Sequence, residues 1–160
     1  MGEVVTAEKL VEVLKNLRQK NKKIVTTNGC FDILHVGHVR YLKQAKNLGN
    51  VLIIGLNTDK SVKSIKGPKR PLNSENDRAE VLTSLECVDY VVLFDEDTPD
   101  KLLDKIKPDI HAKGGDYNID TLPEANIIIK NGGKVVFIPL VEGKSTTALI
   151  EKAAKNKTGL

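Results

Sequence analysis

The spacing of apolar positions along the chain predicts alternating helices and strands. Three leucines recur at helical spacing within Thr6–Gln19, and threonine is a residue that commonly caps a helix. Val51–Leu56 is a continuous apolar run of strand length, which is typical of a strand covered on both faces. Similar runs predict further strands at Ile24–Thr27, Asp89–Phe94, Asp109–Lys113 and Lys134–Pro139. Amphipathic stretches predict helices near Gly37–Leu48, Glu75–Leu85 and Leu122–Lys130, a helix capped by Thr98 with Pro99 at its first position, and a terminal helix capped by Ser145.

This alternation predicts an α/β fold: a single Rossmann-like, doubly wound domain with a mostly parallel five-stranded sheet and an N-terminal helix. We expect residues 1–23 to hold a helix packed on the domain, residues 24–156 to form the domain, and residues 157–160 to be a tail. The stretch Asp59–Asn73 is polar and lysine-rich, and no element is expected there. Ligands of such sheets bind at the carboxyl ends of strands, where the strand order reverses.

Composition places the chain among ordinary globular proteins. Its 160 residues suit one domain, with 40% hydrophobic and 29% charged residues. We expect no membrane span, because the apolar runs are short, and no secretory signal is visible. The two distant cysteines could form a lone disulfide, but their low number favours a reduced, cytoplasmic protein. A net charge of +4 suits either nucleic acid or an enzyme that handles polyanionic nucleotides.

The strongest chemical signal is a pair of histidines, His35 and His38, on either side of Gly37. They follow a predicted strand and its Asn28-Gly29 turn, at the mouth of a helix. A glycine without Cβ lets a phosphorylated ligand approach closely, and a helix amino terminus favours phosphate. Two imidazoles could then contact oxygens whose charge grows in a phosphoryl transition state. The alternative is a capping residue beside a surface residue; a zinc site is disfavoured, because no cysteine or acidic partners accompany the histidines.

Basic residues follow in the loop that contains Lys66, Lys69 and Arg70. This loop suits a leaving pyrophosphate or a sugar phosphate, although Lys69 is interpreted as solvated. Arg78, early in a predicted helix, could contact phosphate or pair with a neighbouring carboxylate, the candidates being Asp77, Glu80 and Glu75.

Other polar groups also come at element ends. Gly114-Gly115 would let the backbone approach a nucleoside, and Asp116 could accept from ribose hydroxyls or cap the following turn. Ser145–Thr147 could bind an anion at a helix terminus or simply cap the helix. Asn57–Asp59 could line the site or form a turn. His111 lies in a strand-like run and is expected in the core or on a sheet face.

Gly29-Cys30-Phe31-Asp32 followed by His35-Val36-Gly37-His38 resembles the cytidylyltransferase-like superfamily, whose mark is histidine-x-glycine-histidine. Within it the chain is most similar to the heptose 1-phosphate adenylyltransferases, or ADP-heptose synthases. The further segments that carry this similarity are Lys66–Asn73, Asp77–Ala79, Phe94–Pro99, Lys113–Tyr117 and Glu142–Thr147.

The resemblance implies transfer of AMP from ATP to D-glycero-β-D-manno-heptose 1-phosphate, with release of pyrophosphate, for lipopolysaccharide core synthesis. It implies Mg²⁺ bound with ATP, and no metal held by the protein itself. The residues implied as catalytic are His35, His38 and Lys66, with Arg70 on the substrate phosphate. The residues implied in nucleotide binding are Asn28, Gly29, Cys30, Phe31, Asp32, Gly37, Asn57, Asp59, Arg78, Gly115, Asp116, Tyr117, Ser145, Thr146 and Thr147.

The resemblance also implies a homodimer and a separate heptose kinase that supplies the sugar 1-phosphate. A glycerol 3-phosphate cytidylyltransferase is the nearest alternative, although that enzyme resembles this chain less at Leu140, where it carries arginine. A basic nucleic-acid-binding module is a remote alternative. We expect no nucleic-acid partner, because aromatic residues make up only 4% of the chain and no basic cluster is interleaved with them.

Overall fold

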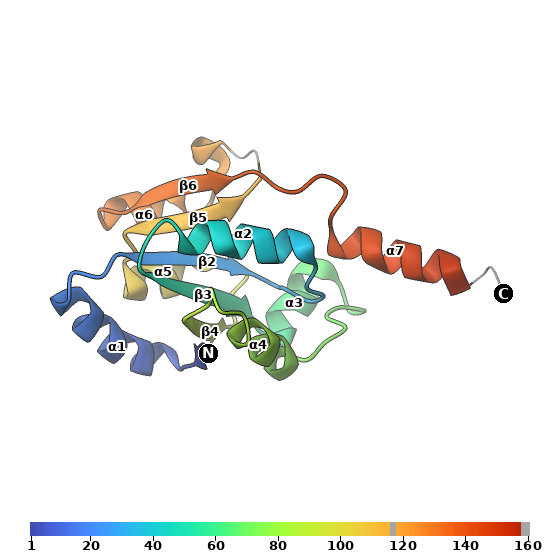
Figure 1. Ribbon diagram of the computed structural model, residues 1–160, viewed down its shortest axis with the longest axis horizontal. Helices are drawn as coiled ribbons and strands as arrows, with labels where there is room; N and C mark the ends of the chain where they lie inside the picture. Colours follow the sequence, from blue (N-terminus) through green and yellow to red (C-terminus); the bar gives the residue numbers. More distant parts are fainter. Residues whose placement is uncertain (116–117, 158–160) are drawn as a thin grey trace.

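The computed structural model describes residues 1–115 and 118–157 and contains one parallel sheet (Figure 1). The described strands, in the spatial order β1-β4-β3-β2-β5-β6, have the bounds β1 Glu3–Val4, β2 Ile24–Gly29, β3 Val51–Asn57, β4 Tyr90–Phe94, β5 Ile110–Gly114 and β6 Lys134–Ile138. The α/β class and the doubly wound sheet are confirmed. The expected count of five strands is wrong, because β1 adds a sixth by pairing in parallel with β4. Two residues are too few to show any periodicity, so the pattern could not reveal this strand.

The helices flank the strands largely where the apolar spacing placed them. Their bounds are α1 Ala7–Gln19, α2 Val36–Lys46, α3 Asp59–Lys66, α4 Glu75–Thr83, α5 Asp100–Ile106, α6 Ala125–Lys130 and α7 Thr146–Lys157, with a 3₁₀ turn at Ile119–Thr121. Side chains of Thr6 and Ser145 accept backbone N–H groups in the first turns of α1 and α7, as predicted. None of the described helices is both long and apolar enough to cross a membrane.

Two local expectations are wrong. Helix α3 lies inside the stretch expected to have no element: Val62 is its one fully buried apolar side chain, too little for an apolar stripe, while Thr58 caps its first turn. Thr98 does not cap α5. Its hydroxyl donates to Asp100 instead, and Pro99 takes the cap position without a side-chain hydrogen bond.

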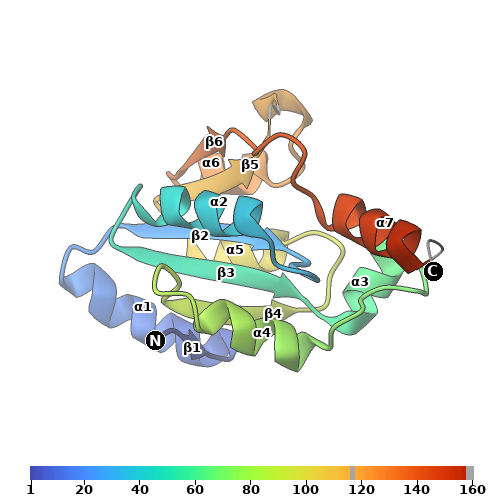
Figure 2. The same ribbon diagram turned by 45° about the vertical axis from the view of Figure 1, so that its right-hand side comes forward.

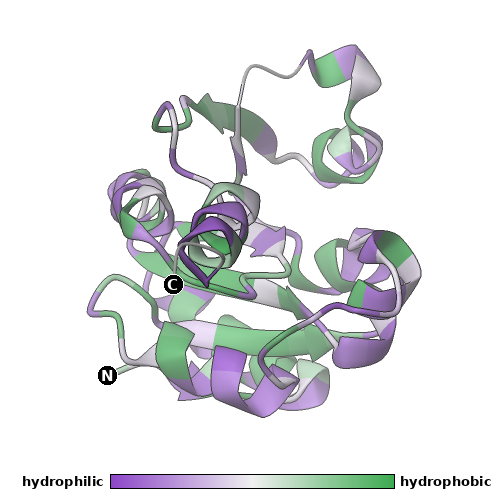
Figure 3. Cartoon of the chain, turned by 90° about the vertical axis from the view of Figure 1, so that its right-hand side faces the viewer, coloured by the Kyte–Doolittle hydropathy of each residue, from purple (hydrophilic) through white to green (hydrophobic). Residues whose placement is uncertain are grey.

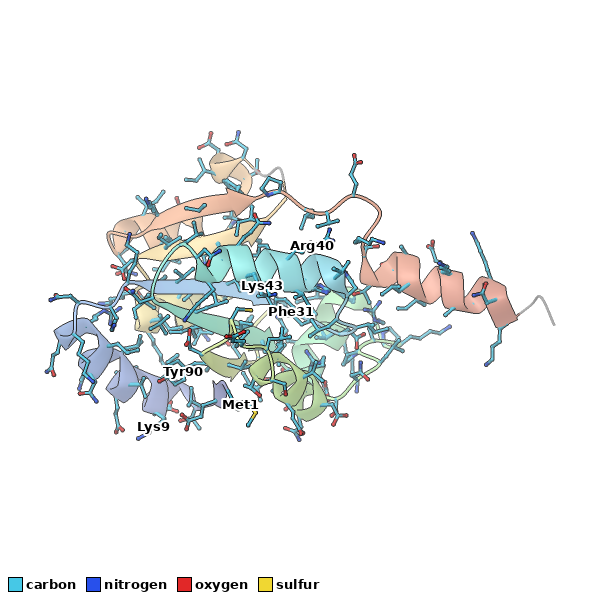
Figure 4. All side chains as sticks on the ribbon, in the orientation of Figure 1. Met1, Lys9, Phe31, Arg40, Lys43 and Tyr90 are labelled. Carbon is cyan, nitrogen blue, oxygen red and sulfur yellow. The ribbon has the colours of Figure 1, made fainter. Side chains whose placement is uncertain are left out.

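Helices cover both faces of the sheet (Figures 1 and 3), and the strands between them are the most hydrophobic part of the chain. On one face α2 and α4 bury side chains such as Leu42 and Leu82 against the strands. On the other face α1 and α5 bury Leu10, Leu14 and Ile106. Figure 4 labels Lys9 on α1 and Tyr90 on β4, and Arg40 and Lys43 on α2. The sheet is therefore covered on both sides, which leaves its strand ends for binding.

The strand order reverses beside β2. The chain builds β2, β3 and β4 outward in one direction and then returns to place β5 on the opposite side of β2. The connections after β2 and β5 consequently diverge, and a crevice opens at the carboxyl ends of these two strands. Beyond β6 the chain crosses toward this end of the sheet, and α7 projects beside α3 with none of its residues buried (Figures 1 and 2).

Arg78 ties together the loops at the carboxyl edge of the sheet. Its side chain is fully buried, and its guanidinium donates to the backbone carbonyls of Cys30, Asn57 and Asn73 over 2.7–3.1 Å. It also pairs with Asp59 at 2.8 Å, and not with any of the three carboxylates proposed from the sequence. The buried amide of Asn57 is likewise engaged, donating to Ser61. These contacts make Arg78 a structural residue of the loops.

We expect Arg78→Met to destabilise the fold by about 3–5 kcal/mol, because a buried guanidinium that satisfies several acceptors is removed. Denaturant unfolding of the variant measures this loss. Arg40→Met is the matched control, since Arg40 is exposed on α2 and its replacement should change stability by about 0.5 kcal/mol or less. Equal stability of the two variants would contradict the structural role.

Candidate active site

A cavity of about 430 Å³ occupies the crevice at the ends of β2 and β5. It brings together the candidate residues that follow β2 with those that open α7. The predicted site residues that line it are Asn28, Gly29, Cys30, Phe31, Asp32, His35, Gly37, His38, Lys66, Arg70, Ser145, Thr146 and Thr147. Asn57, Asp59, Gly115 and Arg78 are not among its lining residues. The proposed roles of Asp116 and Tyr117, and the tail beyond residue 157, lie outside the described residues.

His35 and His38 form the amino-terminal cap of α2. The backbone N–H of Gly37 donates to Nδ1 of His35 at 3.1 Å, and the backbone N–H of His35 donates to Nδ1 of His38 at 3.3 Å. Each imidazole thus satisfies an N–H group that the helix leaves unpaired. The two rings lie close together, with centroids 3.9 Å apart. The capping role was the alternative interpretation of this motif, and it coexists here with exposure to the cavity.

The caps also decide which ring nitrogen carries the proton. A ring nitrogen that accepts a hydrogen bond cannot carry a proton itself. Because Nδ1 of each histidine accepts, the proton of each neutral imidazole must be on Nε2. Both rings therefore present an Nε2–H group, because their Nδ1 atoms are already used. The pair is a set of two neutral hydrogen-bond donors at a helix amino terminus.

Electrostatics keeps both rings neutral. Burial and the nearby imidazole of His35, together with Lys66, lower the pKa of His38 to about 4. Burial and Lys144 also lower the pKa of His35 from its ordinary value. Two imidazoles stacked beside lysines cannot both take protons without repulsion. At neutral pH they donate hydrogen bonds without acting as cations.

Gly37 makes room for the His35 ring. A Cβ at this position would lie 2.8 Å from Nδ1 and Cε1 of His35, which is closer than side-chain atoms approach one another. The sequence suggested that the missing Cβ admits a ligand to the backbone. The structure gives a further reason, since the cap geometry itself requires glycine.

Asp32 organises the basic loop of residues 66–73. It accepts from the backbone N–H groups of Leu72 and Asn73 at 2.9 Å and from the guanidinium of Arg70 at 2.7 Å. Burial alone would raise the pKa of Asp32, but these donors hold it below its ordinary value. The carboxylate is thereby committed to the loop, and it fixes Arg70 at the wall of the cavity.

The cavity wall is strongly cationic. Lys66, Arg70, Lys113 and Lys144 all line it; Arg70 is paired with Asp32 and Lys113 with Glu124, whereas Lys66 and Lys144 have no carboxylate partner among the described residues. Thr146 donates its hydroxyl to the carbonyl of Ile33 at 3.0 Å and so holds the start of α7 against the loop after β2. A cavity with this charge, next to the amino termini of two helices, suits a polyphosphate.

Sequence reasoning did not assign five of the lining residues to the site: Lys144, Lys113, Tyr41, Leu140 and Val141. Lys144 stands within a segment quoted for the resemblance, so its charge was a usable signal. Tyr41 lies on the buried face of α2. Its hydroxyl bonds to Thr27 at 2.6 Å and donates to the carbonyl of Ala112 at 2.9 Å, which joins β2 to β5 below the cavity.

Cys30 lines the cavity without the features of a nucleophile. Both cysteines, Cys30 and Cys87, are free. Burial raises the pKa of the Cys30 thiol despite nearby Lys66, Arg78 and Arg70. A raised pKa disfavours the thiolate, which is the reactive form. The chemistry of the cavity is therefore that of hydrogen-bond donors and cations.

Comparison with known proteins agrees with this geometry. The family described as cytidylyltransferase-like matches residues 26–152. Proteins named "Bifunctional protein HldE" from Syntrophotalea carbinolica and from a Nitratiruptor species are 52% and 53% identical over 145 residues. These matches cover 91% of this chain and 30% of each relative, so the chain spans less than a third of their length.

One solved structure extends the likeness to the backbone. It is the crystal structure of the lipopolysaccharide core biosynthesis protein from Thermoplasma volcanium GSS1, with 32% identity and a TM-score of 0.62. The match covers 77% of this chain and 99% of that one. The histidine cap, the strand order and these matches lead to one conclusion: the chain belongs to the cytidylyltransferase-like family.

Proposed function

We propose that the chain transfers AMP from ATP to D-glycero-β-D-manno-heptose 1-phosphate and releases ADP-heptose and pyrophosphate. The observation that carries the proposal is the pair of neutral Nε2–H donors at the start of α2, inside a cation-lined cavity. The name of the similar lipopolysaccharide core biosynthesis protein supports a sugar as the acceptor. The chain spans only part of the relatives named HldE, so their whole activity is not assigned to it.

The reaction is a direct displacement at phosphorus. A phosphate oxygen of the sugar 1-phosphate attacks the α-phosphorus of ATP, the new P–O bond forms, and the bond to pyrophosphate breaks. Both reactants are anions, so bringing them together requires positive charge and fixed positions. His35 and His38 would donate from Nε2 to α-phosphate oxygens, whose negative charge grows as phosphorus becomes five-coordinate.

Other residues would hold the ends of the reactants. Lys66, Lys144 and the amino terminus of α7 lie on the cavity wall and suit the leaving pyrophosphate. Arg70, which Asp32 fixes in place, suits the phosphate of the sugar. A sugar kinase would supply this phosphate, since free heptose has none at its anomeric carbon.

We also propose Mg²⁺ as the metal, entering with ATP. Within the described residues no group of three histidine, cysteine, aspartate or glutamate side chains could hold a metal ion, and Asp32 is already bound by three donors. Phosphate oxygens are the hard ligands that Mg²⁺ prefers, so ATP itself can supply them. An ion bound there would neutralise part of the charge of the leaving pyrophosphate.

The catalytic role of the histidines can be separated from their capping role. Asparagine places a polar group near the Nδ1 position of histidine and is a favoured cap, whereas it has nothing at the Nε2 position. We expect His35→Asn and His38→Asn to keep the fold but lower kcat by about 10²–10³, as for loss of an oxyanion donor. Steady-state kinetics and thermal unfolding measure the two effects. Near-native turnover in both folded variants would refute the catalytic assignment.

Substrate choice is tested by measuring kcat/KM for matched pairs with Mg²⁺. ATP with D-glycero-β-D-manno-heptose 1-phosphate should be the best pair. CTP with glycerol 3-phosphate should be poor, because a site that hydrogen-bonds one base leaves polar groups unpaired with another. Heptose 7-phosphate should fail, because its phosphate is at the wrong end of the sugar. A clear preference for CTP and glycerol 3-phosphate would replace the heptose assignment.

Acid should destabilise the protein through His38. Its pKa is about 4 in the folded chain against an ordinary 6.5, so between these values the unfolded chain binds a proton that the folded chain does not. The stability from neutral His38 is complete above about pH 6.5 and is lost as the pH falls toward 4. His38→Asn should therefore flatten the fall in unfolding free energy over this interval. Parallel curves for the variant and the wild type would contradict the lowered pKa.

A further inference from the structure

A row of polar side chains runs along the face of the sheet opposite α2 and ends at the cavity. Thr26 and Asn28 are two residues apart on β2 and so face the same side, as do His111 and Lys113 on β5. Thr26 lies beside His111 in the register, and its hydroxyl lies 2.8 Å from Nδ1 of the histidine. The two strands therefore present these residues to one common face.

Glu124, the residue before α6, completes the row. It is only 3% exposed, and its Oε1 lies 2.7 Å from Nζ of Lys113 and 3.7 Å from Nε2 of His111. The second distance is too long for a hydrogen bond, and Nε2 of His111 has no partner among the described residues. Burial lowers the pKa of His111, so the ring is neutral. The firm contact of Glu124 is thus with Lys113.

Asn28 carries another unsatisfied atom in the same row. Its Oδ1 is buried and has no hydrogen-bond partner in the described part of the chain. Gly55 on β3 is the neighbour of Asn28 on this face. A Cβ at Gly55 would lie 3.4 Å from the Cβ of Asn28, so the glycine leaves the space beside the amide without a side chain. Asn28 and Lys113 both line the cavity. A buried polar atom without a partner is costly, so its place at a cavity wall points to a ligand atom.

The charge at this end of the cavity differs from that at the histidine end. Lys66 and Lys144 have no carboxylate within ion-pair distance among the described residues. Lys113, in contrast, is neutralised by Glu124. Burial would raise the pKa of Glu124, but the hydrogen bond and positive charge of Lys113, with the His111 ring nearby, lower it to about 2, so the carboxylate stays charged. A phosphate would gain little electrostatic attraction here, because Lys113 is already paired, and it has no proton to donate to Oδ1 of Asn28.

We propose that Asn28, Lys113 and Glu124 form a subsite that binds the vicinal hydroxyls of a sugar. A hydroxyl both donates and accepts, so it can donate to Oδ1 of Asn28 and accept from Nζ of Lys113 at once. Glu124 is the positioning residue, because it holds the ammonium group at the wall. The inference rests on the proposed function, which supplies two such sugars: the ribose of ATP and the acceptor sugar.

The test uses the double variant Lys113→Gln/Glu124→Gln, which keeps the length of the Glu124 side chain, slightly shortens that of Lys113 and leaves no unpaired buried charge. Calorimetry compares ATP with 2′-deoxy-ATP and 3′-deoxy-ATP, and heptose 1-phosphate with its 2-deoxy analogue. The wild type should prefer one hydroxylated ligand over its deoxy analogue by about 10- to 100-fold, the range for hydrogen bonds to a charged group. The double variant should reduce that preference to about 2-fold or less. If the preference changes for ATP and its deoxy analogues, the subsite binds the ribose; if it changes for heptose 1-phosphate and its analogue, the subsite binds the acceptor sugar.

Two further variants separate recognition from folding. Asn28→Leu removes the amide without touching the ion pair and should also reduce the preference. Lys69→Gln removes a lysine charge outside the cavity lining and should leave the preference unchanged, with thermal unfolding confirming that each variant folds. Because binding is measured without turnover, an absence of transfer to heptose 1-phosphate would refute the proposed function and not this subsite. Wild-type preferences retained in both arms by Asn28→Leu and the double variant would overturn the subsite.

Discussion

The active site depends on how the first turn of α2 satisfies its unpaired N–H groups. Backbone donors of Gly37 and His35 bind the Nδ1 atoms of His35 and His38. The same hydrogen bonds begin the helix, fix the ring tautomers and direct two Nε2–H groups outward. Because the rings are half-buried and close together, they remain neutral. A helix cap and a pair of donors for phosphate are here one arrangement, and a change that disturbs the first disturbs the second.

The second constraint is the balance of charge around the loops. Arg70 and Arg78 are both paired with a carboxylate, and each bond fixes a loop end beside the histidines. Buried guanidinium groups need such partners, because an unpaired charge in the interior is costly. Lys66 and Lys144, which are exposed, keep their charge for a ligand. The excess of positive charge in the sequence is therefore partly structural and partly concentrated at the cavity.

Periodicity predicted most of this fold because it records burial. Leu10 and Leu14 of α1 and the continuous run in β3 are buried as their spacing indicates. It failed where an element is held by a few contacts: β1 has two residues, and α3 depends on a cap and one fully buried apolar side chain. The histidine motif located the site, because its residues are consecutive. The pairing of Arg78 with Asp59 was not predicted, since sequence spacing does not reveal which polar groups meet across loops.

Strand order also explains why one cavity can offer two kinds of chemistry. β2 and β5 are neighbours with their connections on opposite sides, so residues at their ends reach the cavity from both faces of the sheet. The histidines reach the cavity from the α2 face, and Lys66 and Lys144 line the cavity near them without a carboxylate partner among the described residues. From the other face come Asn28 and Lys113, the latter already neutralised by Glu124. A substrate that carries both phosphates and hydroxyls fits this arrangement. Its phosphates can bind to the histidines and lysines, and its hydroxyls can form hydrogen bonds with Asn28 and Lys113.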